Sequence, residues 1–102
     1  MANISTSIHE RVAVIRVQGR FDFLASAAFR ESSRNITAAP GPKEIEVDLG
    51  EVDYIDSTAL GCLLFLRDSA RMNGKTVVLV GINGTIAPVL SIANFNRLFD
   101  YR

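Results

Sequence analysis

One hydroxyl group, that of Ser57, lies where the sequence predicts that a helix begins directly after a strand. Asp56, Ser57 and Thr58 are residue types that cap helices, and an apolar run over 59–66 follows at once. The first N–H groups of a helix have no carbonyl partner within it and lie at the positive end of its dipole. A phosphate on Ser57 would meet these donors, so the chemistry that we expect here is phosphorylation of a serine hydroxyl.

Each of these residues also has a simpler structural interpretation. Ser57, taken alone, is more often a plain helix N-cap than a phosphorylation site. Asp56 either shares the capping or orients the Ser57 hydroxyl, and the residue types leave both roles open. Thr58 is expected to be mainly structural, with secondary phosphorylation as the alternative. Asp22 is expected to cap an earlier helix.

The segments around this motif predict an α/β fold. Apolar patterning predicts strands over 4–9 and 11–18, joined as a hairpin, with Gly19 ending the second strand. Strict alternation over 44–49 predicts a half-exposed strand that leads into the Ser57 turn.

Three helices and two further strands are expected between and after these segments. The helices run from Asp22 to a break at Pro40-Gly41-Pro42, from about Thr58 to Met72, and over a short segment capped by Thr85. The strands cover 76–80 and 98–101. This order predicts right-handed crossovers in a single domain over 1–102. Its mixed, mostly parallel sheet has about four to five strands and is covered by about three helices.

Composition narrows the classes of partner. The chain has 102 residues, of which 48% are apolar, and its eleven basic and eleven acidic residues give a net charge of zero. Bulk charge therefore favours neither nucleic acid nor an anionic membrane surface. The single cysteine, Cys62, is expected to be a buried core thiol in a reducing compartment. Neither a signal peptide nor an apolar run of bilayer length is present, so we expect a cytoplasmic protein without direct membrane contact.

No catalytic, metal or cofactor site is expected. Six acidic residues lie between 44 and 56, but acids that alternate along a strand do not converge on one ion as ligands must. The only histidine, His9, has no partner with which it forms a recognisable acid–base pair. The segment 81–85 lacks the spacing and the lysine of a phosphate-binding loop, so an ordinary turn is favoured.

The segment 48–64 resembles the central motif of the STAS domain, the fold of bacterial anti-sigma factor antagonists. That motif is a strand ending in aspartate–leucine, a short polar turn, and aspartate–serine–serine–glycine–leucine–glycine; here Asp56-Ser57-Thr58-Ala59-Leu60-Gly61 occupies the second part. Gly19-Arg20-Phe21-Asp22 and the segment 95–99 resemble two flanking family features. The resemblance covers nearly the whole chain.

Two departures from the family pattern concern the loop and the end of the chain. Ala59 stands where the family most often has glycine, and Thr58 replaces the second serine, which leaves a second hydroxyl available. The sequence ends at Arg102, where many relatives continue into a final helix. This is expected to leave one sheet face less covered.

The resemblance implies a binding module rather than an enzyme. A serine-protein kinase that is also an anti-sigma factor would phosphorylate Ser57, and a PP2C-type phosphatase would reverse the modification. The unphosphorylated form would bind the kinase and free its client, and the phosphorylated form would dissociate from the kinase. The alternative is a STAS subunit that acts as a scaffold in a membrane transport (ABC-type) complex. The residues expected to face the partner are Asp22, Asp56, Thr58, Ala59, Leu60 and Cys62.

Release from the partner is expected to follow from local charge. A phosphoserine carries about −1.5 to −2 charges at neutral pH. A partner shaped around a neutral hydroxyl and a small apolar collar, with Ala59, Leu60 and Cys62 as candidates, would have to bury this charge unpaired. The fold itself is expected to survive phosphorylation.

Overall fold

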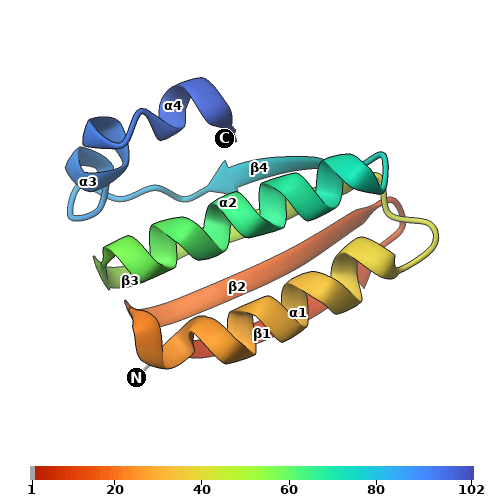
Figure 1. The fold of residues 1–102 in the computed structure, drawn as a ribbon, viewed down its shortest axis with the longest axis horizontal. Coiled ribbons are helices and arrows are strands. Elements are labelled where there is room, and N and C mark those ends of the chain that lie inside the picture. The colour runs from red at the N-terminus through yellow and green to blue at the C-terminus, as the bar shows by residue number, and fades with distance from the viewer. Residues whose placement is uncertain (1) are drawn as a thin grey trace.

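The computed structural model describes residues 2–102, which form an α/β fold (Figure 1). The strands are β1 (Asn3–His9), β2 (Val12–Phe21), β3 (Glu44–Ile55), β4 (Thr76–Val80) and β5 (Asp100–Tyr101). The α-helices are α1 (Ser26–Ala38), α2 (Ser57–Met72), α3 (Ala87–Ile92) and α4 (Phe95–Leu98), and a 3-10 turn, η1 (Phe23–Ala25), precedes α1. In residues 2–102 no helix combines the length and the apolar character needed to cross a bilayer.

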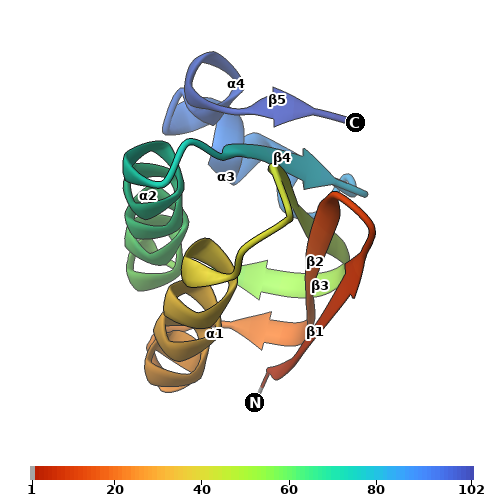
Figure 2. The same cartoon turned by 90° about the vertical axis from the view of Figure 1, so that its right-hand side faces the viewer.

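The five strands form one sheet in the order β1-β2-β3-β4-β5. β1 pairs antiparallel with β2, and the remaining neighbours pair in parallel. The predicted mixed, mostly parallel sheet is therefore confirmed. Helices α1 and α2 lie side by side on the same face of this sheet (Figure 2).

The core lies between this sheet face and the two long helices. Ile45, Val47 and Leu49 of β3 are fully buried, whereas the acidic residues that alternate with them are half-buried on the opposite face. The alternation in the sequence therefore assigned the two faces of β3 correctly. Beneath α1, the rings of Phe21 and Phe29 pack with their centroids 4.9 Å apart.

Two strands run further than expected, because a glycine in each forms an irregularity instead of ending the strand. Gly19, with φ of +92°, lies at a register shift, and β2 continues to the buried Phe21. In β3 the Gly50 amide donates a hydrogen bond to the Asp48 side chain (3.0 Å) at another shift in the β2–β3 register. Pairing with β2 then resumes and continues as far as Ile55. Both glycines behave as bulge residues.

Two helix starts differ from expectation. Asp22 accepts from the Leu24 amide (3.1 Å) and so caps η1, which then leads into α1. Thr85 does not cap α3. Instead, the Asn83 side chain accepts from the Thr85 amide (2.9 Å) and the Ile86 amide (3.2 Å), and its NH2 group donates to the Val52 carbonyl (2.8 Å). An Asn side chain is one atom longer than a Thr hydroxyl arm and carries both donor and acceptor, so it joins this turn to β3.

The C-terminal region is also more helical than expected. The strand predicted over 98–101 is shorter, because Leu98 belongs to α4 and only Asp100–Tyr101 pair with β4. The Arg102 amide extends this pairing by donating to the Leu79 carbonyl (2.9 Å).

Candidate functional site

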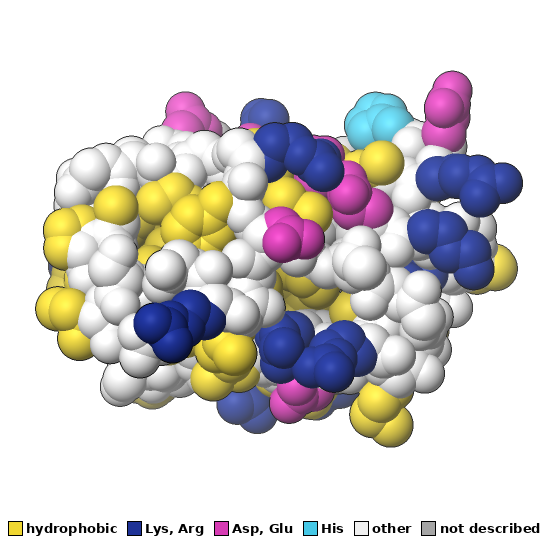
Figure 3. Space-filling model, turned by 90° about the horizontal axis from the view of Figure 1, so that it is seen from above, with side chains coloured by type: hydrophobic (Ala, Val, Ile, Leu, Met, Phe, Trp, Pro, Cys, Tyr) yellow, Lys and Arg dark blue, Asp and Glu magenta, His cyan; other side chains and the backbone are white. Residues whose placement is uncertain are grey.

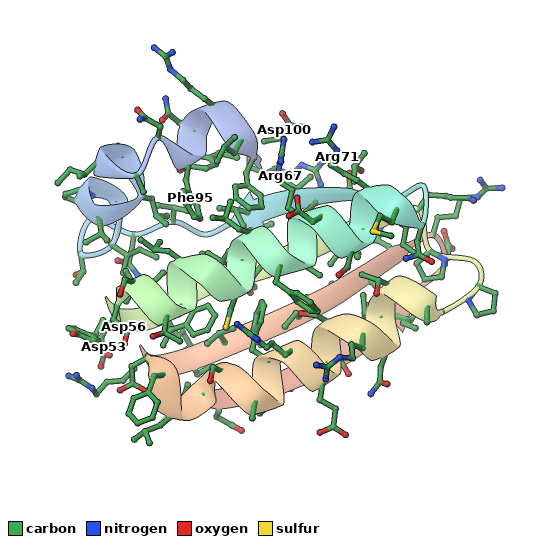
Figure 4. All side chains as sticks on the ribbon, viewed as in Figure 1. Asp53, Asp56, Arg67, Arg71, Phe95 and Asp100 are labelled. Carbon is green, nitrogen blue, oxygen red and sulfur yellow. The ribbon has the colours of Figure 1, made fainter. Side chains whose placement is uncertain are left out.

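Asp22, Asp56 and Ser57 lie where the neighbouring strands β2 and β3 end. These strands are parallel, and Phe21 at the end of β2 pairs with Ile55 at the end of β3, so both strands finish at the same end of the sheet. The turn after β2 carries Asp22, and the turn after β3 carries Asp56. Figure 4 shows Asp53 and Asp56 at the N-terminal end of α2. The carboxyl ends of parallel strands are the usual location of functional residues in α/β folds.

Asp56 joins the two turns and caps α2. One carboxylate oxygen accepts from the Ala59 amide (2.9 Å), and the other accepts from the Phe23 amide (3.2 Å). The Asp56 amide in turn donates to the Phe21 carbonyl (3.3 Å). Of the two roles left open by the sequence, the geometry provides the capping role directly. The same carboxylate also fixes the start of η1 beside Ser57.

Ser57 is the first residue of α2 and is exposed. Because Asp56 is the N-cap, the Ser57 hydroxyl is not needed to cap the helix. The amides of Ser57 and Thr58 belong to the first turn and have no carbonyl partner within the helix. Thr58 is half-buried, so of the two hydroxyl residues Ser57 is the more accessible.

The collar expected around Ser57 needs a correction. Ala59 and Cys62 are fully buried and contribute to the core, so they offer no surface to a partner. They occupy the inward side of the first turns of α2, whereas Leu60 is half-buried at the rim. Burial raises the pKa of the Cys62 thiol above its ordinary value of 9.0, partly opposed by the nearby Arg30 guanidinium. The thiol is therefore neutral near pH 7, as expected for a core cysteine.

Comparison with known proteins assigns the family. Residues 3–102 match the STAS domain. This chain belongs to the STAS domain family. A STAS-domain containing protein of Pseudomonas aeruginosa is 39% identical over 85 residues, which are 83% of this chain and 82% of the relative.

Other relatives carry functional names. An anti-sigma-B factor antagonist of Staphylococcus aureus is 25% identical over 96 residues, covering 94% of this STAS domain and 88% of the relative. Two solved structures share the fold. An anti-sigma factor antagonist from Mycobacterium paratuberculosis superposes with a TM-score of 0.86 at 17% identity, covering 99% of this chain and 85% of the other. The phosphorylated form of the Bacillus cell fate determinant SpoIIAA superposes with a TM-score of 0.76 at 15% identity. The match covers 98% of this chain and 91% of the other.

The structure of this STAS domain has an apolar surface beside Ser57 that was not predicted from the sequence. Phe23 and Leu24 in η1 are 64% and 60% exposed, and Tyr54 at the end of β3 is 42% exposed. The hydrogen bond that the Phe23 amide donates to the Asp56 carboxylate holds η1 next to the residue that precedes Ser57. The signal in the sequence was two consecutive apolar residues after Asp22 that lie outside the Ala25, Phe29 and Ile36 stripe.

Charges around Ser57 have both signs. Asp53 is exposed, and Asp22 is mostly buried, with its side chain 14% exposed. The Arg20 side chain approaches Asp22 (Nε to Oδ2, 3.4 Å), and its guanidinium lies 3.9 Å from the centroid of the Tyr54 ring. One cation is therefore held at this edge of the STAS domain by a carboxylate and an aromatic face.

Proposed function

We propose that this STAS domain is an anti-sigma factor antagonist whose binding is controlled by phosphorylation of Ser57. In this proposal the unphosphorylated domain binds a serine-protein kinase that also acts as an anti-sigma factor, and so frees the client of that kinase. Phosphorylation releases the domain, and a PP2C-type phosphatase restores binding. The observation that carries the proposal is an exposed serine at the first position of α2, beside the cap residue Asp56. The names of the Staphylococcus aureus relative and of phosphorylated SpoIIAA support the role.

The fold is expected to tolerate the modification. Asp56 caps α2, so a phosphate on Ser57 removes no capping hydrogen bond. The positive end of the helix dipole favours the new charge by about 0.3–1 kcal/mol at an exposed position. Asp53 and Asp56 oppose it by like-charge repulsion. The two effects oppose each other, so we expect the free energy of unfolding of the domain to change little.

The partner is expected to cover η1 together with the start of α2. Phe23 and Leu24 would supply exposed apolar area, with Thr58 and Leu60 at the rim and with Asp22 and Asp56 placing the two turns. Partner contacts are rich in aromatic anchors surrounded by polar groups. A phosphate on Ser57 would stand inside this contact as a desolvated dianion. An unpaired buried charge costs about 3–5 kcal/mol, which is more than a hundredfold in affinity.

The test uses four forms of the domain as baits in lysate of the host. They are wild type, Ser57→Ala, Ser57→Asp and a matched control, Ser91→Asp, which adds the same charge at an exposed serine of α3. We expect wild type, Ser57→Ala and Ser91→Asp to capture a serine kinase, identified by mass spectrometry, and Ser57→Asp to capture none. Equal capture of transporter subunits by all four baits would favour the scaffold alternative and reject the switch.

A second measurement separates local release from refolding. Amide spectra of Ser57→Asp and wild type are expected to differ only near η1 and the first turn of α2. Shifts spread through β4 and α3 would contradict release by local charge. In the same binding assay Phe23→Ala should weaken capture of the kinase, while Ile92→Ala, which truncates an 84% exposed residue in α3, should not.

A further inference from the structure

A second concave site lies at the other end of α2. A pocket of about 280 Å³ opens between the last turns of α2, the short helix α4 and the neighbouring strands β4 and β5. Figure 4 shows Arg67 and Arg71 on α2 close to Asp100, on the side where α4 ends. Ser57 and Arg71 are fourteen positions apart along α2, a rise of about 21 Å. The pocket is therefore distinct from the Ser57 site.

The lining of this pocket is strongly basic. Four cationic residues contribute to it, Arg67, Arg71, Lys75 and Arg97, against one carboxylate, Asp100. Figure 3 shows Lys and Arg side chains gathered beside a hollow with an apolar floor. A net positive concave surface in a chain of zero net charge marks a local concentration of charge.

Two of the cations are held in place by backbone carbonyls. The Arg67 Nε donates to the Leu98 carbonyl (2.8 Å), and one terminal nitrogen of the same guanidinium lies 3.9 Å from the exposed Asp68 carboxylate. Lys75 is only 6% exposed, and its Nζ donates to the carbonyls of Ala39 (2.6 Å) and Pro42 (2.7 Å). Lys75 thus adds positive potential behind the pocket, and Arg67 presents preorganised donors.

The other two cations have no acidic partner. Within residues 2–102, neither Arg71 nor Arg97 has a carboxylate within 4.0 Å, and Asp100 forms no ion pair. Arg67 and Arg71 lie one turn apart on α2, where like charges repel. The C-terminus of a helix favours cations, which accounts for Arg71 and Arg97 singly. It does not account for their convergence with Arg67 on one hollow.

We propose that this pocket binds a small oxyanion ligand, a phosphate ester or a polycarboxylate. Planar guanidinium groups bind the oxygens of both classes in pairs of hydrogen bonds. The volume lies near the lower limit of ligand pockets, about 300 Å³, so it admits a small molecule. Apolar atoms of Val77 and Phe99 in the lining would contact the carbon skeleton. The Asp100 carboxylate would repel the anionic groups, so it favours a ligand that also carries a hydrogen-bond donor.

The test titrates the whole domain with inorganic phosphate, pyrophosphate and citrate, each against sodium chloride of equal ionic strength. Amide spectra and calorimetry report binding. We expect at least one probe to give saturable shifts confined to 67–77 and 96–101, and the tighter probe distinguishes phosphate from carboxylate chemistry. Absence of saturable shifts with all three probes would overturn the proposal.

Single arginine-to-alanine substitutions test whether the anion binds in this pocket. Arg71→Ala and Arg97→Ala change exposed residues, so both should fold, and each should weaken binding about tenfold or more because a charged hydrogen bond is lost. Arg11→Ala removes an exposed arginine from the β1–β2 turn and should leave binding unchanged. Equal weakening by all three variants would indicate nonspecific charge attraction and would also overturn the proposal. None of these variants alters Ser57, so the result is independent of the proposed switch.

Discussion

At the scale of single residues, one carboxylate organises the proposed switch. Asp56 accepts hydrogen bonds from Ala59 within α2 and from Phe23 in η1, which lies 33 residues earlier. The first bond starts the helix that carries Ser57, and the second holds the apolar pair Phe23 and Leu24 beside it. The Ser57 hydroxyl itself does not cap α2. Because Asp56 provides the cap, we expect a modification of Ser57 to leave the domain folded.

We predict that Asp56→Ala lowers the free energy of unfolding by about 2 kcal/mol, because it removes a helix cap and a charge-assisted bond to a loop amide. Urea denaturation followed by circular dichroism measures the change. Asp53→Ala is the matched control, since it removes an exposed aspartate three residues earlier and should change stability by less than about 0.5 kcal/mol. Equal effects of the two substitutions would contradict the assigned role of Asp56.

At the scale of elements, the end of β4 contacts the bulge in β3 at two glycines, Gly81 and Gly50. Gly81 has φ of +70°, and a Cβ at this position would lie 3.1 Å from both Cα and N of Gly50. The Asp48 side chain would be only 3.2 Å away. This close contact lets Asn83 reach the carbonyl of Val52 and bond the start of the α3 turn to β3.

Gly81→Ala should destabilise the domain by about 2 kcal/mol, because a left-handed backbone is strained for alanine and the new Cβ would crowd Gly50. Gly84→Ala provides the control, since a Cβ at Gly84 meets nothing within 4 Å and its φ is not positive. Thermal unfolding of both variants measures the difference. If Gly81→Ala were as stable as Gly84→Ala, the described contact between β3 and β4 would be wrong.

At the scale of the whole molecule, Arg102 links the end of the described chain to the central strand. Its guanidinium donates hydrogen bonds to both carboxylate oxygens of Glu44 (3.0 and 3.1 Å) and to one oxygen of Glu46 (3.0 Å). The hydrogen bonds from Arg102 lower the pKa of Glu44 below its ordinary value of 4.5. β4 lies between the two partners in the sheet, so the pair spans three strands.

A depressed carboxyl pKa predicts the pH dependence of this link. The stabilisation is fully present above about pH 4.5 and disappears as the pH falls through the lower pKa of folded Glu44. Wild type should therefore unfold at a slightly higher temperature than Arg102→Ala at pH 7, and the gap should narrow and close as the pH falls below 4.5 through the pKa of folded Glu44. The effect is small, because both side chains are partly exposed to water. A gap that is constant with pH, or one equally large for Arg11→Ala, would exclude the ion pair as its cause.

The sequence by itself determined the features that depend on neighbours along the chain. Alternation over 44–49 assigned the two faces of β3, and Asp56 before an apolar run located the start of α2 within one residue. The motif around Ser57 identified the STAS family, which the match over 3–102 confirmed. Periodicity and capping are local properties, because they arise from hydrogen bonds and burial within a few residues.

Only the tertiary structure decided which distant residues meet. The bond from Phe23 to Asp56 joins residues 33 apart, and the Arg102–Glu44 bonds join residues 58 apart. Burial of Ala59 depends on how α2 packs on the sheet, so the family resemblance placed Ala59 on the partner surface and the structure places it in the core. For Cys62 the apolar run had already predicted a buried thiol, and the structure confirms this over its expected place on the partner surface. Strand order and helix packing bring such residues together, and neither is encoded in any single segment.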